Sequence, residues 1–395
     1  MARTESGRID GARIDEVLAR AVESGEVPHV AAIVADRDGV LYEGGAGVRV
    51  VGESTDPVTT STQFRIMSMT KMVATTVALQ QVERGELDLS APVADYLPEF
   101  ADLQVLTGFD GDTPQYRPPA SQATVQQLVT HTSGLGYWFW NADLVRWEAA
   151  TGTPNVVPGT MAAFRAPLTA DPGTSFVYGI NTDWLGRVVE TVAGTTLDRA
   201  VAEGVTGPLG MHDTMFLLDE QRAGNLVTVH VPGEDGGWTS AGEILNQSPE
   251  WFAGGHGLYS TPRDYTRFER ALLRGGELDG VRILREDTVD AAFTSQLGDI
   301  AFPTEIPTAD PAITDTFHPG PGWTWGHGLL INTVDVPGGR RAGTGAWAGL
   351  FNTHFFIDRT TGICASVYTN SLPFIAQGGA WKTYTDVEQA VYASL

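Results

Sequence analysis

Ser68 and Lys71 have the residue types and the spacing of a nucleophile and its base. They stand three residues apart in the stretch FRIMSMTKMVA (64–74), so on a helix their side chains share one face. A serine hydroxyl is a weak nucleophile at neutral pH and needs a base beside it. A lysine serves as that base only if burial or a helix N-terminus lowers its pKa, whereas an arginine stays protonated.

The scarcity of lysine makes Lys71 more informative. Among 25 basic residues only Lys71 and Lys382 are lysines. Retention of an amine here is explained if that amine must be able to lose its proton. The same two residues also fit a simpler interpretation, in which Ser68 caps the helix and Lys71 is an exposed first-turn residue. From this pair alone, both interpretations stay open.

The pair requires a helix, which we expect from about Ser68 to Arg84, ended by Gly85. Strand pairs are predicted over 29–47 and 353–370, and further helices over 12–24, 124–129, 181–194, 261–276 and 381–395. The simplest architecture is an α+β fold. Residues 1–64 and 256–395 form one mixed antiparallel sheet flanked by helices, and residues 65–255 form a mostly helical second domain. The active site is expected at the seam between the two.

Composition excludes several function classes. The formal net charge of -23 would repel nucleic acid and anionic lipid, and no run is long enough to span a membrane. The N-terminus has no apolar segment typical of a secretory signal, so a cytoplasmic protein is expected. Cys364 is the single cysteine and is interpreted as a buried core residue. None of the eight histidines has metal-ligand spacing, and no phosphate- or dinucleotide-binding loop is present, so no metal and no cofactor are expected.

Three further stretches, together with SMTK, carry a family resemblance. They are FVYGINTDWLGRVVE (176–190), FAGGHGLYSTPRDYTRF (252–268) and GTGAWAGLFNTHFFID (343–358). In order and spacing the chain resembles the serine β-lactamase and penicillin-binding-protein superfamily. Within it, the chain is most similar to the class C β-lactamase-like carboxylesterases, called family VIII esterases. The resemblance runs from about residue 10 to 390 and implies a β-lactamase-like fold.

The resemblance implies roles for particular residues. Ser68 matches the serine that is acylated, Lys71 the lysine that shares its proton, and Tyr178 the tyrosine that acts as general base. Without the other motifs, Tyr178 would be interpreted as a loop tyrosine packed against the following helix. The triplet Trp-Ala-Gly (347–349) matches the third motif, so Trp347 and Gly349 are expected to line the substrate cleft. The backbone N–H groups of Leu350 and Ser68 would form the oxyanion hole.

Two departures from the β-lactamase pattern indicate the substrate. Trp347 stands where β-lactamases and peptidases carry a cation for the carboxylate of their substrate. The second motif is Tyr-Gly-Ile, so the usual asparagine is missing, although Asn181, one place further on, could substitute. Both departures favour an uncharged, apolar or aromatic ester. Asp183 is interpreted chiefly as a first-turn acid that favours the helix dipole.

Candidate pocket residues come from an aromatic segment, GLGYWFWNADLVRW (134–147). This segment forms either a buried plug or a wall of an apolar pocket, and Tyr137 is expected near the cleft. His256 lies near the predicted site and could touch the substrate, although structural packing is the favoured interpretation. His131 and Ser133 are interpreted as turn residues.

The sequence therefore predicts a serine hydrolase that cleaves carboxylic esters through an acyl-enzyme on Ser68. An acyltransferase that passes the acyl group to an alcohol or amine would use the same residues, as would an amide or β-lactam hydrolase. A binding protein without activity is a further alternative, although Ser68, Lys71 and Tyr178 are all retained. The expected partner is a small-molecule ester, with no nucleic acid and no membrane, and the oligomeric state stays open.

Overall fold

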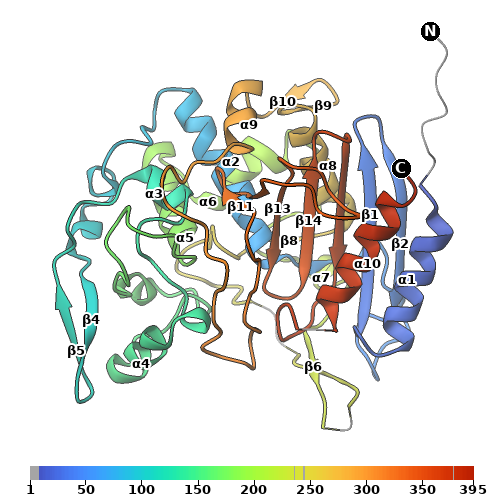
Figure 1. The fold of residues 1–395 in the computed structure, drawn as a ribbon, viewed down its shortest axis with the longest axis horizontal. Helices are drawn as coiled ribbons and strands as arrows, with labels where there is room; N and C mark the ends of the chain where they lie inside the picture. The colour runs from blue at the N-terminus through green and yellow to red at the C-terminus, as the bar shows by residue number, and fades with distance from the viewer. Residues whose placement is uncertain (1–8, 235, 243–244, 377) are drawn as a thin grey trace.

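A seven-stranded antiparallel sheet forms the centre of the protein (Figure 1). The structure, a computed structural model, describes residues 9–234, 236–242, 245–376 and 378–395. In the strand order β11-β12-β13-β14-β15-β1-β2, the two ends of the chain meet where β1 pairs with β15. The sheet strands are β1 (His29–Asp36), β2 (Val40–Gly47), β11 (Trp323–Trp325), β12 (Leu330–Asn332), β13 (Gly345–Gly349), β14 (Thr353–Asp358) and β15 (Ile363–Tyr368).

Helices cover both faces of this sheet, which explains why its middle strands are apolar throughout. Along β1, Val30, Ala32 and Val34 pack with α1 (Gly11–Glu23) and α10 (Ala380–Tyr392), while Ala31 and Ala35 belong to the larger core on the opposite side. That opposite side is covered by α8 (Pro262–Leu273). Because successive side chains of a strand point to opposite faces of the sheet, the apolar residues of β1 pack alternately into two cores.

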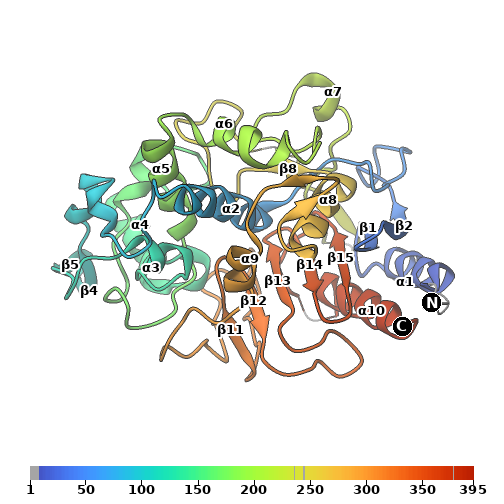
Figure 2. The same cartoon turned by 90° about the horizontal axis from the view of Figure 1, so that it is seen from above.

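The helical part of the chain lies beside the sheet, on the left in Figure 1. Its central helix is α2 (Thr70–Glu83), which Figure 2 shows between the sheet and the green helices; its buried residues run from Thr70 to Gln81 without a break. The other helices are α3 (Val125–Val129), α4 (Ala142–Thr151), α5 (Asn181–Ala193), α6 (Leu197–Val201), α7 (Glu220–Ala223) and α9 (Glu286–Ala292). The minor strands are β3 (Phe64–Arg65), β4 (Val105–Asp110), β5 (Thr113–Arg117), β6 (His230–Pro232), β7 (Trp238–Ser240), β8 (Tyr259–Ser260), β9 (Glu277–Leu278) and β10 (Val281–Arg282).

Both predicted domain boundaries meet at one small sheet. Strand β3 pairs with β8, so Phe64 lies opposite Ser260 and Arg65 opposite Tyr259. The division into residues 1–64 with 256–395 and residues 65–255 stays a prediction, but this pairing locates where the chain passes between the sheet and the helices. Among the described residues, no helix is long and apolar enough to cross a membrane.

Candidate active site

Ser68 lies in a short 3₁₀ helix, η1 (Met67–Met69), directly before α2, rather than in the first turn of the α-helix itself. Met67 has a φ of 46°, a left-handed conformation that costs a non-glycine residue about 1–2 kcal/mol. Hydrogen bonds hold this turn from outside. Tyr265 donates to the carbonyl of Met69 (2.9 Å), and Thr353 donates to the carbonyl of Ile66 (3.1 Å). The surrounding fold therefore imposes the conformation that presents Ser68.

The Lys71 amine is the centre of the site. It is fully buried in the first turn of α2 and donates to Ser68 Oγ (3.0 Å), Tyr137 OH (3.0 Å) and the carbonyl of Gly255 (2.8 Å). Burial lowers the pKa of Lys71, because the charged ammonium is deprived of water, and Asp183 opposes this shift. The ammonium form donates to all three neighbours, whereas the neutral amine has two N–H groups and a lone pair that can accept the proton of Ser68 Oγ.

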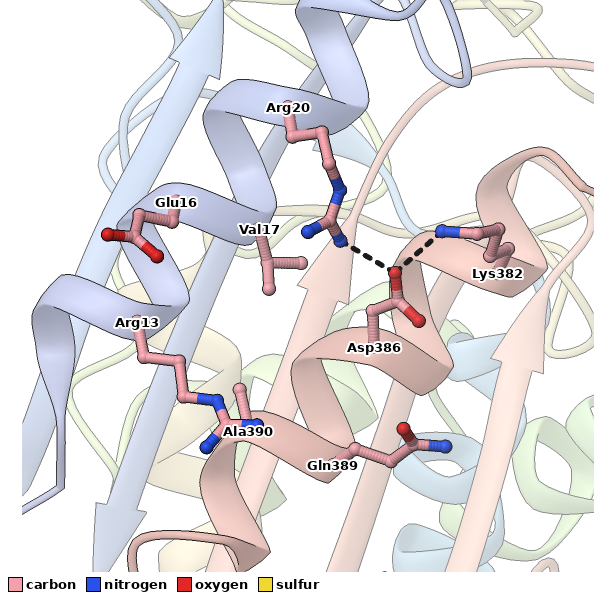
Figure 3. Close-up of a pocket in the computed structure, with 8 residues that line it drawn as sticks. All are labelled: Arg13, Glu16, Val17, Arg20, Lys382, Asp386, Gln389 and Ala390. Carbon is pink, nitrogen blue, oxygen red and sulfur yellow. Dashed lines mark hydrogen bonds and ion pairs between the residues drawn. The ribbon is translucent and has the colours of Figure 1, made fainter.

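The second lysine provides a contrast within the same chain. Lys382 lies on α10 at the groove between α1 and α10, where it and Arg20 both bond to Asp386, at 2.7 and 2.8 Å (Figure 3). Its side chain is 43% exposed. The hydrogen bond to Asp386 raises the pKa of Lys382, so this amine stays charged. The two lysines therefore occupy opposite electrostatic environments, and only that of Lys71 favours the neutral amine.

Asp183 lies closer to the chemistry than its sequence position suggested. It is in the first turn of α5, but its carboxylate is fully buried and accepts from the N–H of Gly255 (2.8 Å). Burial raises its pKa, while Lys71, Gly255 and Tyr137 lower it. A Cβ at position 255 would lie 2.6 Å from Asp183 Oδ2, so only glycine allows this approach. The helix-dipole interpretation is therefore incomplete, because this carboxylate also stabilises charge on Lys71.

Tyr178, just before α5, brings a phenol to the same point. Its ring centroid is 4.8 Å from Lys71 Nζ, and its oxygen accepts from Trp347 Nε1 (2.8 Å). Burial raises the pKa of Tyr178, and hydrogen bonds from Ser68 and Trp347 lower it. The structure therefore brings together the three groups that the resemblance selected, although they come from η1, α2 and the segment before α5.

Strand β13 borders the site. Strand β12 pairs with it at Gly345 and Ala346, and the following residues reach η1. A Cβ at Gly349 would clash with the Ile66 carbonyl oxygen and with Thr353, so glycine allows the strand to approach the Ser68 turn. Leu350 follows directly and is half-buried. The strand therefore ends beside the Ser68 turn, which brings Leu350 close to the nucleophile. That the N–H groups of Leu350 and Ser68 form the oxyanion hole stays a prediction.

The aromatic segment divides between the site and its surroundings. Tyr137 is buried, with its hydroxyl on Lys71 and its ring stacked on Phe139 at 5.0 Å. It therefore belongs to the hydrogen-bond network of the lysine, and its place at the substrate cleft stays a prediction. Trp140 is also buried, with its ring 5.5 Å from that of Tyr178. Tyr137, Phe139 and Trp140 are buried, as a plug requires, while a role of this segment as a wall of the substrate pocket stays a prediction.

Asn181 and the residues of the THTSG turn have structural partners. Asn181 is fully buried; its amide donates to the carbonyl of Leu135 (3.0 Å), and its oxygen accepts from Ser133 (2.5 Å). His131 Nδ1 lies 2.9 Å from the same amide nitrogen. These bonds occupy the Asn181 amide, so it does not replace the missing substrate-binding asparagine. The turn interpretation of His131 and Ser133 agrees with this geometry.

His256 directly follows Gly255, whose carbonyl accepts a hydrogen bond from Lys71. Its Nδ1 is 3.8 Å from Asp183 Oδ1, and burial, with a smaller effect of Lys71, lowers its pKa to about 3. It lines a cavity of about 30 Å³ with Trp251 and Phe252. An uncharged His256 therefore packs behind the lysine, and substrate contact stays a prediction. Within the described ranges, no group of three His, Cys, Asp or Glu residues is placed to hold a metal ion.

Comparisons with known proteins identify the family and the fold. Residues 14–388 match the family model described as Beta-lactamase. A lovastatin esterase of Penicillium rubens is 32% identical, covering 89% of this chain and 90% of its own length. A monacolin J acid methylbutanoyltransferase of Aspergillus terreus is 29% identical, covering 91% of each. The unliganded simvastatin synthase of the same organism has a TM-score of 0.82 at 27% identity, over 97% of this chain and 98% of that one. The expected β-lactamase-like fold is confirmed.

Proposed function

The chain belongs to the beta-lactamase family, and from this premise we propose that it is a serine carboxylesterase acting through an acyl-enzyme on Ser68. The observation that carries the proposal is the hydrogen bond from the buried Lys71 amine to Ser68 Oγ. A lysine in this environment has a lowered pKa and can take part in proton transfer. The similarity to an esterase over most of both chains supports the same reaction.

In the first half-reaction, Ser68 Oγ attacks the ester carbonyl and its proton passes to the Tyr178–Lys71 pair. The N–H groups of Ser68 and Leu350 stabilise the negative charge on the carbonyl oxygen. The C–O bond to the alcohol then breaks, and the pair returns the proton to the leaving alkoxide. In the second half-reaction, water attacks the acyl-enzyme by the same route, which releases the acid and restores Ser68.

The substrate is proposed to be uncharged. Trp347 places an indole at the position where a cation would bind a substrate carboxylate, and its N–H is already committed to Tyr178. The charge of Lys71 is balanced nearby by Asp183. A carboxylate entering this site would lose its hydration without gaining a cationic partner, which is unfavourable. Apolar or aromatic esters therefore fit better than penicillin-type substrates.

Acyl transfer is the second candidate, and the methylbutanoyltransferase relative is the observation that favours it. The two reactions share every step up to the acyl-enzyme and differ in whether water or another alcohol attacks it. Product analysis with added alcohol at increasing concentration separates them. A transferase gives mainly the new ester at millimolar alcohol, whereas an esterase gives mainly the free acid.

The direct test is intact-mass analysis after exposure to activated esters and to a fluorophosphonate. We expect one covalent adduct on the wild-type protein and none on Ser68→Ala. Rapid nitrocefin turnover, combined with slow turnover of p-nitrophenyl butyrate, would instead favour an amide or β-lactam hydrolase. An unmodified wild-type protein across all reagents would favour a binding protein.

The two lysines supply a matched pair of variants. Lys71→Arg keeps the positive charge but removes the ability to release a proton, so we expect at least about a 1,000-fold loss of kcat, in line with loss of a general base and its geometry. Lys382→Arg makes the same substitution at an exposed ion pair and should leave kcat unchanged. Equal activity in the two variants would contradict the proposed role of Lys71.

A further inference from the structure

A cavity of about 120 Å³ lies between α10 and the β11–β13 end of the sheet. Its floor includes Ala346 and Ala348 of β13 and His354 of β14, which share one face of the sheet with α10. Residues 317–319, in the segment before β11, and residues 374–375, after β15, close its sides. The elements that meet there, β11, β13 and α10, can be followed in Figure 1.

The walls of this cavity are mainly aromatic, and two of them reach the proposed catalytic tyrosine. Trp140 and Trp347 both line the cavity, and their rings lie 5.5 and 4.9 Å from the ring of Tyr178. Trp140 also lies parallel to Phe317, at 6.3 Å. A group in the cavity would therefore contact two side chains that pack against the proposed catalytic tyrosine.

The cavity offers no net charge. Arg340 lines it but is buried and bonded to Glu388, with Nε 2.9 Å from Oε1, and to the Tyr384 hydroxyl. Because a buried guanidinium and a buried carboxylate compensate each other here, an additional charged group would be unpaired. Aromatic walls and balanced charge together favour an uncharged ring.

Two side chains of the cavity wall, Trp140 and His354, each have a buried nitrogen without a hydrogen-bond partner among the described residues. His354 is 2% exposed, and its Nε2 has no hydrogen-bond partner among the described residues. Its ring is stacked on Tyr384 at 4.6 Å and on Phe374 at 5.9 Å. Burial, with a smaller effect of Arg340, lowers the pKa of His354 to about 3, so the imidazole is neutral. A neutral imidazole has one donor and one acceptor, and an unused buried nitrogen is costly unless a ligand meets it.

We propose that this cavity binds an uncharged ring of the ester substrate, with a hydroxyl or carbonyl group of that ring paired to His354. The inference rests on the proposed esterase function, because it assigns the ring to the same molecule that acylates Ser68. The ring belongs either to the acyl group or to the alcohol, and the two cases share the same recognition chemistry.

The first experiment compares three esters. Ethyl acetate has no ring, ethyl phenylacetate has a ring in the acyl group, and benzyl acetate has a ring in the alcohol. For the wild-type protein we expect kcat/KM to be at least about ten-fold higher for one of the ring-bearing esters than for ethyl acetate. The preferred one identifies which part of the ester enters the cavity.

Ala348→Leu fills the cavity from its floor and should lower that ratio by at least about ten-fold. Ala150→Leu, on the exposed side of α4, makes the same substitution elsewhere and should leave the ratio unchanged. A fall of equal size for all three esters in Ala348→Leu would overturn the cavity assignment and leave the esterase function standing. A wild-type protein that hydrolyses none of them would refute the esterase function itself.

His354→Phe tests the polar contact and does not depend on Ala348→Leu folding. Phenylalanine keeps a ring to stack on Tyr384 and Phe374 but removes both nitrogens. The ester that the first experiment identifies is compared with the same ester carrying a 3-hydroxyl group on its ring. We expect the wild type to prefer the hydroxylated ester by about five-fold or more, and His354→Phe to lose this preference, as expected for one neutral hydrogen bond. An unchanged preference, in a variant with wild-type thermal unfolding, would overturn the assignment of His354.

Discussion

Trp347→Phe separates a role of Trp347 in proton transfer from a role in substrate packing. The indole Nε1 donates to Tyr178 OH at 2.8 Å, and this hydrogen bond lowers the pKa of the phenol. Phenylalanine removes the donor but keeps an aromatic ring beside Trp325, whose ring centroid lies 4.7 Å away. The variant therefore changes the electrostatics of Tyr178 more than the packing around it.

The magnitude follows from the difference between the two protonation states. A hydrogen bond to a neutral acceptor contributes about 1 kcal/mol and one to a charged acceptor about 1.5–3 kcal/mol. The phenolate therefore loses about 0.5–2 kcal/mol more than the phenol, which raises the pKa of Tyr178 by about one unit at 1.36 kcal/mol per unit. Since a base with a higher pKa is deprotonated less at a given pH, kcat/KM at pH 7 should fall about ten-fold.

The assay is kcat/KM for a small ester between pH 5 and pH 10. Because burial raises the pKa of Tyr178 above its ordinary value of about 10, this whole range lies on the rising limb, and we expect Trp347→Phe to lose about ten-fold at every pH and for every ester. Trp147→Phe is the matched control, because Trp147 Nε1 also donates to a tyrosine, Tyr116, at 2.7 Å, but on α4 and β5. The pH profile of kcat/KM for Trp147→Phe should match that of the wild type. A loss that is large for ring-bearing esters and absent for a small ester would refute the reasoning and assign Trp347 to substrate packing alone.

Three other perturbations have defined outcomes. Gly255→Ala places a Cβ 2.6 Å from Asp183 Oδ2 and should reduce kcat at least about ten-fold, as expected when a positioned group is displaced, whereas Gly39→Ala, with open space around it, should not. Burial raises the pKa of Glu269 far above its ordinary value, so the folded protein keeps a proton that the unfolded chain releases near pH 4.5. Stability should therefore fall by about 1.4 kcal/mol per pH unit above that point, and Glu269→Gln should remove this slope in urea unfolding at pH 5 and pH 8. Burial, with His230, lowers the pKa of His29 to about 3, so its contribution to stability is complete above about pH 6.5 and is lost as the pH falls towards 3. His29→Gln should flatten the unfolding free energy between pH 6.5 and 4.5 by about 1.4 kcal/mol per pH unit; an unchanged slope would contradict the assignment.

Local signals in the sequence located the elements well. Gly25 and Gly85 end α1 and α2 near the expected positions, and Asp36–Gly39 connects β1 to β2 as a tight turn. These features depend on residues that are close in the sequence, so the local sequence predicts them. The seven-stranded order depends on pairing between distant segments, which no local pattern specifies.

The site was only partly predictable for the same reason. Ser68 and Lys71 are close in sequence, so their chemistry could be inferred from spacing, whereas Tyr178 was reached through the family resemblance. The role of Asp183 was predicted only in part, because the helix dipole already explains an acidic residue in the first turn of a helix. Its contact with Gly255 connects two segments far apart in the chain, and the only signal was a pair of glycines at 254 and 255.

The pairing of β1 with β15 also sets the order of events during synthesis. The β1–β2 hairpin emerges first, yet one edge of β1 is completed only by a strand near the C-terminus. At usual translation rates, roughly tens of seconds pass between the synthesis of β1 and that of β15. During this time the backbone N–H and C=O groups on that edge of β1 lack their partner strand. A growing chain in this condition is a target for chaperones and for pairing with other chains, so premature termination anywhere before β15 should yield aggregates rather than a smaller folded protein.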